Sequence, residues 1–123
     1  MGLDQYAYSV DPRLVEGEVD FKVPDGSARQ IAYWRKHPDL QGWMEELYRA
    51  KGGVEEFNCV PVRLESEDLD ALEEAVRDGD LPRTSGFFFG ESSEDDADDD
   101  LRFIRDAKAE LAEGRAVYYT SWW

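Results

Sequence analysis

The sequence predicts an α+β fold, with a small antiparallel or mixed sheet of four to six short strands and three helices mainly on one of its faces. Apolar residues recur at helical spacing in three segments, whereas alternating apolar residues gather near both ends of the chain. We therefore expect the first and last strands to pair. The length of 123 residues fits a single domain that spans 1–123.

The first part of the chain predicts three strands. Residues 3–10 alternate in polarity, and so do residues 19–23, where Val19, Phe21 and Val23 share one parity. The sequence Pro-Asp-Gly-Ser at 24–27 is typical of a turn, and 29–34 follows it as a third strand. A hairpin across that turn is the expected arrangement.

The first predicted helix begins at Pro38, because proline suits the first helical turn. Its apolar stripe has helical spacing and comprises Leu40, Trp43, Met44, Leu47 and Tyr48. Gly52 or Gly53 can adopt the left-handed conformation that ends a helix. We expect Trp43 and Met44 to pack in the core.

A fourth strand is predicted over 57–64, where Pro61 removes one backbone donor and indicates either an edge position or an unpaired residue. Cys59 within it is expected to be a buried thiol. Ser66 is the expected N-cap of a second helix that ends at Gly79.

A third helix is predicted from Leu101 to Leu111, with Gly114 as its stop, before a last strand whose end carries Trp122 and Trp123. Residues 91–100 hold seven acidic residues and no basic one. We expect this acidic run to form a mobile loop.

The formal net charge of −15 disfavours direct binding to nucleic acid and to anionic membranes. It suits a basic host protein or a nucleic-acid-binding complex as partner. The alternative is an adaptation to salt or to solubility, since the chain has only four lysines: Lys22, Lys36, Lys51 and Lys108. With no signal peptide and no long apolar run, a cytoplasmic location is expected.

Common catalytic chemistries find no matching motif in this sequence. No glycine-rich loop with a lysine precedes a helix, and His37 is the single histidine, so neither a phosphate-binding loop nor a hydrolase triad is predicted. Asp96, Asp98 and Asp100 resemble the start of a calcium loop, but Leu101 stands where its glycine is needed. We therefore predict no catalytic residue, no metal and no cofactor. We expect that the protein is not an enzyme.

Four segments resemble a family of small bacteriophage and prophage proteins: MGLDQYAY, YWRKHPDLQGWMEELY, LPRTSGFFFG and VYYTSWW. Members of that family are generally of unknown function. Some are named phosphoglycerate kinase, which the short length and the missing phosphate loop of this chain contradict. The resemblance implies a phage-type protein and supplies no catalytic residues.

Two functional hypotheses follow. In the first, an acidic interaction protein imitates nucleic acid and inhibits a host nucleic-acid-binding or defence protein, such as a CRISPR or restriction component. Its partner-binding residues are Glu91, Glu94, Asp95, Asp96, Asp98, Asp99 and Asp100, supported by Asp70, Glu73 and Glu74.

In the second hypothesis, the protein is a small-ligand binder or an unrecognised enzyme. Aromatic walls with a few polar groups are typical of small-molecule pockets. The residues assigned to this pocket are Tyr33, Trp34, Arg35, His37, Tyr118 and Trp122.

Overall fold

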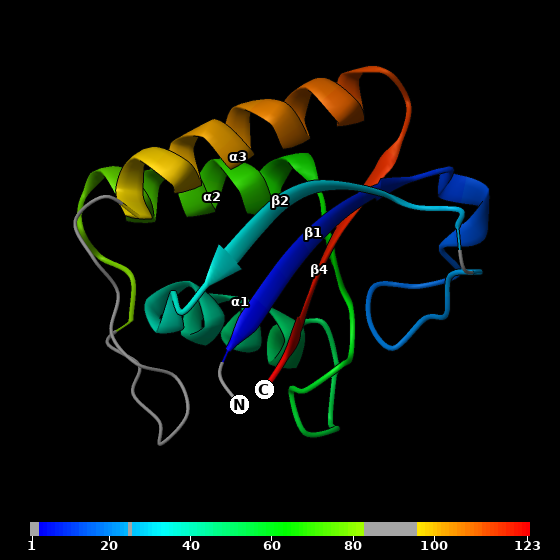
Figure 1. The fold of residues 1–123 in the computed structure, drawn as a ribbon, viewed down its shortest axis with the longest axis horizontal. Helices are drawn as coiled ribbons and strands as arrows, with labels where there is room; N and C mark the ends of the chain where they lie inside the picture. The colour runs from blue at the N-terminus through cyan, green and yellow to red at the C-terminus, as the bar shows by residue number, and fades with distance from the viewer. Residues whose placement is uncertain (1–2, 25, 83–95) are drawn as a thin grey trace.

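A computed structural model describes residues 3–24, 26–82 and 96–123 of the chain (Figure 1). It contains one antiparallel sheet in the order β2-β1-β4-β3, three α-helices and a short 3-10 helix, which confirms the predicted α+β class. The strands are β1 (Asp4–Val10), β2 (Arg29–Arg35), β3 (Val62–Leu64) and β4 (Ala116–Trp122). The helices are η1 (Pro12–Leu14), α1 (Pro38–Ala50), α2 (Ser66–Arg77) and α3 (Asp96–Ala112).

The first and last strands pair along their whole length, as predicted, from Asp4 opposite Trp122 to Val10 opposite Ala116. The three α-helices pack against one face of the sheet, with α2 and α3 side by side (Figure 1). The main core fills the space between that face and the helices. Its fully buried members include Ala7, Leu40, Met44, Tyr48, Leu64, Leu69, Leu72, Ala107, Val117 and Tyr119.

Helix α1 begins at Pro38, as predicted, and Gly52 takes the left-handed conformation after it, with φ of 100°. Met44 is fully buried, whereas Trp43 is half-buried at the margin of the core. Helix α2 has Glu65 rather than the expected Ser66 as its N-cap, and the side chains of Glu65 and Asp68 form a reciprocal capping box.

The predicted hairpin across 24–27 is wrong. Residues 19–23 form no strand, and Val19 makes only an isolated bridge to Val62. Asp20 interrupts the extended run, because its φ of 57° is left-handed and its carboxylate accepts hydrogen bonds from the Tyr48 hydroxyl. β2 therefore pairs with β1, and the intervening chain covers a second apolar cluster on the other face of the sheet.

Within the predicted strand over 57–64, only Val62–Leu64 form a strand, β3. It is the last strand in the order of the sheet, which agrees with the edge position expected from Pro61. Cys59 is exposed, so the expectation of a buried thiol is wrong. Its φ of 63° breaks the alternation on which that expectation rested.

The prediction of a loop over 91–100 is wrong for residues 96–100, which form the start of α3. Residues 91–95 lie outside the described part of the chain. Carboxylates are favoured at a helix N-terminus by the helix dipole, so a dense acidic run can begin a helix as readily as it can form a loop.

Candidate functional site

The six residues of the predicted ligand pocket do not line one pocket. Side chains alternate across a regular strand, so the neighbouring residues Tyr33 and Trp34 of β2 point to opposite faces of the sheet. Tyr33 and Arg35 are exposed on the face opposite the three described α-helices, which we call the outer face. Trp34 points to the other side and is buried, as is His37 just beyond the strand.

Trp34 and His37 belong instead to a buried polar network that joins β2 to α3. The indole N–H of Trp34 donates to Asp100 Oδ1 at 3.0 Å, and His37 Nε2 lies 2.7 Å from Asp100 Oδ2. Gln5 links this corner to β4, because its amide donates to the His37 carbonyl and to the Tyr119 hydroxyl, each at 2.9 Å. The network is inaccessible to a ligand and fixes the position of α3.

The outer face carries a continuous chain of aromatic rings. Tyr33 and Tyr6 lie 5.3 Å apart between ring centroids, Tyr6 and Tyr8 lie 6.1 Å apart, and Tyr8 and Tyr118 lie 5.3 Å apart. Phe21 completes the chain with an edge-on contact to Tyr118 at 5.3 Å. These rings come from all three long strands and from the segment between β1 and β2.

One end of this aromatic chain is open to solvent. Tyr33 is 49% exposed and Trp122 is 64% exposed, although both are large aromatic residues. Asp4 lies opposite Trp122 in the sheet and accepts a 2.7 Å hydrogen bond from the Tyr33 hydroxyl. Arg35 Nε is 3.8 Å from the Asp4 carboxylate, a loose pairing of two partly exposed side chains.

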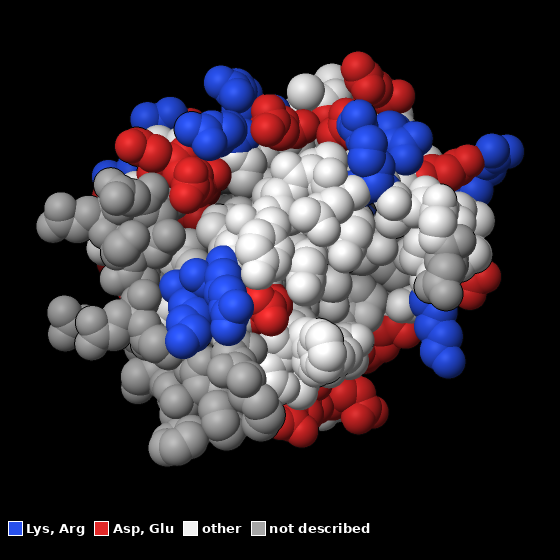
Figure 2. All heavy atoms as spheres, viewed as in Figure 1, with Lys and Arg blue, Asp and Glu red and all other residues white. Residues whose placement is uncertain are grey.

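The surface above β1 and β2 is uncharged at its centre, with acidic and basic side chains around it (Figure 2). At the other end of the aromatic chain, a hollow of about 270 Å³ opens beside Tyr8 and Tyr118. Its remaining lining residues are Val23, Pro24, Gly26 and Ala28. The outer face thus combines exposed rings, a neutral centre and a hollow.

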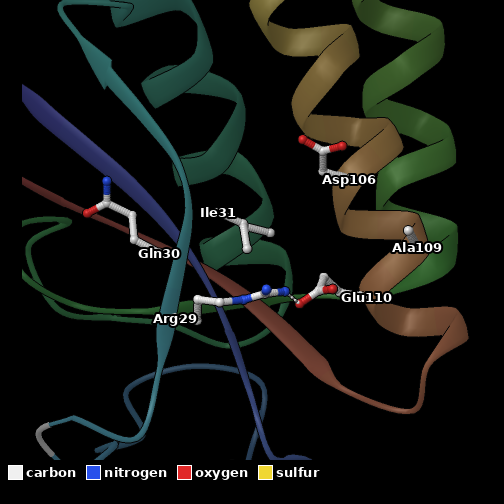
Figure 3. A pocket seen from close by; sticks show the side chains of 6 residues that line it. All are labelled: Arg29, Gln30, Ile31, Asp106, Ala109 and Glu110. Carbon is white, nitrogen blue, oxygen red and sulfur yellow. Dashed lines mark hydrogen bonds and ion pairs between the residues drawn. The ribbon is translucent and has the colours of Figure 1, made fainter.

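A second hollow of about 340 Å³ lies between the free edge of β2 and α3 (Figure 3). Arg29 of β2 reaches across it and forms an ion pair with Glu110 of α3, while Ile31 points toward the helix. A hydrogen bond from Ser9 and the Arg29 guanidinium hold the pKa of Glu110 below its usual range, although burial opposes them. This ion pair crosses the hollow and links β2 to α3.

The acidic residues predicted to bind a partner differ in their exposure and in their ion pairs. Asp100 is 1% exposed and cannot reach a partner. Asp70 and Glu73 each lie 2.8 Å from Lys108 of α3, and Glu73 also pairs with Arg77, so their charges are partly balanced. Glu74, Asp98 and Asp99 are exposed. Glu91, Glu94 and Asp95 lie outside the described residues, as does the side chain of Asp96.

The aromatic chain includes three residues that are absent from the predicted pocket: Tyr6, Tyr8 and Phe21. The sequence carried a signal for Tyr6 and Tyr8, because both share one parity of a strand that was predicted to be half-buried. Among residues 3–24, 26–82 and 96–123, no three His, Cys, Asp or Glu side chains are grouped to hold a metal ion. Nor is any helix in that part of the chain long and apolar enough to cross a membrane.

Comparisons with protein-family models, with curated proteins and with solved structures find no match to this chain.

Proposed function

We propose that this chain is a non-enzymatic interaction protein that binds a basic protein partner through the outer face of its sheet. The observation that carries the proposal is the open end of the aromatic chain, where Trp122 and Tyr33 stand exposed on the outer face, which carries none of the described α-helices. Tryptophan and tyrosine are enriched at the centres of protein interfaces, where a few such residues supply most of the binding energy.

The charge of the chain supports a basic partner. A net charge of −15 accelerates encounter with a positively charged protein and opposes self-association. A host protein that normally receives nucleic acid, such as a CRISPR or restriction component, is the class of partner that this combination suits. The exposed carboxylates of Glu74, Asp98 and Asp99 would then act in steering, while the neutral aromatic face forms the contact that excludes water.

The test is a comparison of variants in a pulldown of host proteins at low salt. Trp122→Ala and Tyr33→Ala remove exposed rings from the outer face. Val54→Ala is the matched control, because Val54 is 83% exposed but outside the sheet. We expect the same basic host protein to be retained by the wild type and by the control, and to be lost by at least tenfold from each aromatic variant.

A second set of variants separates long-range electrostatic attraction from direct contact at the outer face. Asp98→Asn combined with Asp99→Asn should weaken capture at low salt and have little effect at high salt, because screening already suppresses long-range attraction there. Equal retention of every host protein by Trp122→Ala and by the wild type would rule out the outer face as the contact. Recovery of only acidic or neutral partners would rule out the role of charge.

A further inference from the structure

We infer that the outer face recognises an extended, proline-containing segment with one basic residue, through the hollow at Tyr8 and Tyr118 and the carboxylate of Asp4. This inference rests on the proposed function and names the kind of segment that the partner presents. Two features of the outer face, the hollow and Asp4, lie at opposite ends of β1 and are joined by the rings of Tyr8 and Tyr6.

The chemistry of the hollow favours proline. Two stacked tyrosine rings form one wall, and Val23, Pro24, Gly26 and Ala28 also line the hollow, so none of its described lining residues is charged. A proline ring is flat and apolar enough to pack on an aromatic ring. Polyproline II segments are also extended before they bind, so docking them orders little additional chain.

The tyrosine hydroxyl groups suit the backbone of such a segment. A polyproline II helix makes no internal hydrogen bonds, so its carbonyl groups need external donors. Tyr6 and Tyr8 are half-buried on the outer face, and each carries a hydroxyl donor on a ring that can also pack against proline. A row of tyrosines therefore offers both apolar contact and hydrogen bonding.

The length of β1 sets the spacing within the ligand. Tyr8 and Asp4 are four residues apart, which is about 14 Å at the usual strand rise of about 3.4 Å per residue. A polyproline II helix rises about 3.1 Å per residue, so it covers this distance in about four or five residues. A basic side chain four or five positions from the proline would therefore reach Asp4.

Charge selects a basic residue at that position. The Asp4 side chain is 27% exposed, and its pairing with Arg35 is loose at 3.8 Å, so a ligand guanidinium can share the carboxylate. The net charge of −15 repels an acidic peptide, single-stranded nucleic acid and a second copy of this chain. The experiment below includes an acidic peptide and a single-stranded nucleic acid as alternative ligands.

The experiment uses the full chain and four synthetic probes in isothermal titration, with backbone amide NMR shifts to locate binding. The probes are an oligoproline, the same oligoproline with an arginine five positions from its central proline, the same peptide with glutamate in place of arginine, and an oligothymidylate. We expect the arginine peptide to bind at least tenfold more tightly than the glutamate peptide, with shifts confined to β1, β4 and the hollow.

Variants assign the two ends of the ligand. Asp4→Asn keeps an acceptor for Tyr33 and removes the charge, so it should abolish the preference for arginine and leave the plain oligoproline unaffected. Tyr8→Ala removes one wall of the hollow and should weaken both proline peptides at least tenfold, whereas Val54→Ala should change neither. Each variant is checked for a native NMR spectrum first, and Tyr8→Phe, which keeps the ring, should retain most of the apolar contact.

Three outcomes would overturn the inference: no binding of the arginine peptide, shifts away from the outer face, or tighter binding of the oligothymidylate. If the peptides fail while Trp122→Ala and Tyr33→Ala still lose the captured host protein, the inference fails and the proposed function stands. If those variants also retain the host protein, the outer face is not an interface and both fail.

Discussion

The indole N–H of Trp34 donates a hydrogen bond of 3.0 Å to a carboxylate oxygen of Asp100, a residue 66 positions away in the chain. The second carboxylate oxygen lies 2.7 Å from His37 Nε2. Asp100 is 1% exposed, Trp34 is 4% exposed and His37 is 3% exposed. One buried carboxylate thus joins the end of β2 and the start of α1 to the first turns of α3.

Asp100→Ala should reduce the free energy of unfolding by about 3 kcal/mol, because it leaves polar groups of Trp34 and His37 without this partner inside the protein. Asp100→Asn, which keeps one acceptor, should have about half that effect. Asp99→Ala is the matched control: Asp99 is exposed and pairs with Arg102, so about 0.5 kcal/mol or less is expected. Urea denaturation measures all three, and equal effects of Asp99→Ala and Asp100→Ala would contradict this role.

Gly53→Ala should destabilise the protein because a Cβ at Gly53 would lie 2.3 Å from the ring of Tyr48, which is fully buried. We expect a loss of about 2–3 kcal/mol from this overpacking. Gly52→Ala meets no atom but has φ of 100°, so it should lose only about 1–2 kcal/mol from backbone strain. The combination with Tyr48→Leu distinguishes the two: it should rescue part of the Gly53→Ala effect and none of the Gly52→Ala effect. Thermal unfolding of the double variants measures this coupling.

Local sequence patterns were sufficient to predict the fold class. They did not predict the buried polar network of Trp34, His37 and Asp100. Strand alternation and helical spacing placed β1, β2, β4 and the first two helices, because each element buries one regular face. Asp100 lies in a run of acids, and nothing local distinguishes a carboxylate that meets Trp34 across 66 residues from its solvated neighbours. The left-handed backbone at Asp20 likewise depends on a tertiary partner, the Tyr48 hydroxyl.

The sequence identified three aromatic residues of the outer face, Tyr33, Tyr118 and Trp122, but not the arrangement that places them on one face. Tyr33 and Trp34 are adjacent aromatics, and only the pleat of β2 assigns one to the outer face and the other to the core. The acidic residues could not be ranked from composition, because the charges of Asp70 and Glu73 are partly balanced by Lys108 from another helix.

Glu65→Gln should make the stability of the protein less dependent on pH. A hydrogen bond with Glu18, together with burial, raises the pKa of Glu65 above 4.5, and hydrogen bonds from Glu65 and Lys51 lower the pKa of Glu18 although burial opposes them. A raised folded pKa stabilises the protein below the unfolded pKa, and this stabilisation is lost as pH rises through the folded pKa. Glutamine stays neutral and can still cap α2.

At pH 7 the Glu65→Gln variant should therefore be more stable than the wild type by about 0.5–1 kcal/mol, a typical size for one charge pair near a surface. The advantage should shrink as the pH falls toward 4.5, the ordinary value for a glutamate. Urea denaturation across this range measures the difference. A Glu67→Gln variant, on the exposed first turn of α2, should show no such trend, and a stability difference for Glu65→Gln that does not change with pH would refute the raised pKa of Glu65.

The thiol of Cys59 should react with a soluble disulfide reagent in the native protein. The side chain is exposed, so we expect one thiol per chain to be modified at a rate within about tenfold of the rate in the unfolded protein. The absorbance of the released thiol measures both rates. Protection by a hundredfold or more would show a buried thiol and contradict the exposed turn before β3. Cys59→Ser should abolish the reaction and leave the unfolding transition unchanged.

Tyr118 should make the protein sensitive to alkaline pH. Burial, with a smaller contribution from Tyr8, raises the pKa of Tyr118 from 10.0 to about 12. Stabilisation from this neutral hydroxyl is complete below pH 10 and is lost between pH 10 and 12, by at most about 3 kcal/mol for two pKa units. Tyr118→Phe keeps the ring and has no proton to lose, so it should lose less stability than the wild type across this window. Tyrosinate absorbance and urea denaturation at each pH measure the two effects. Parallel loss of stability in both proteins would show that Tyr118 ionises as freely as an exposed tyrosine.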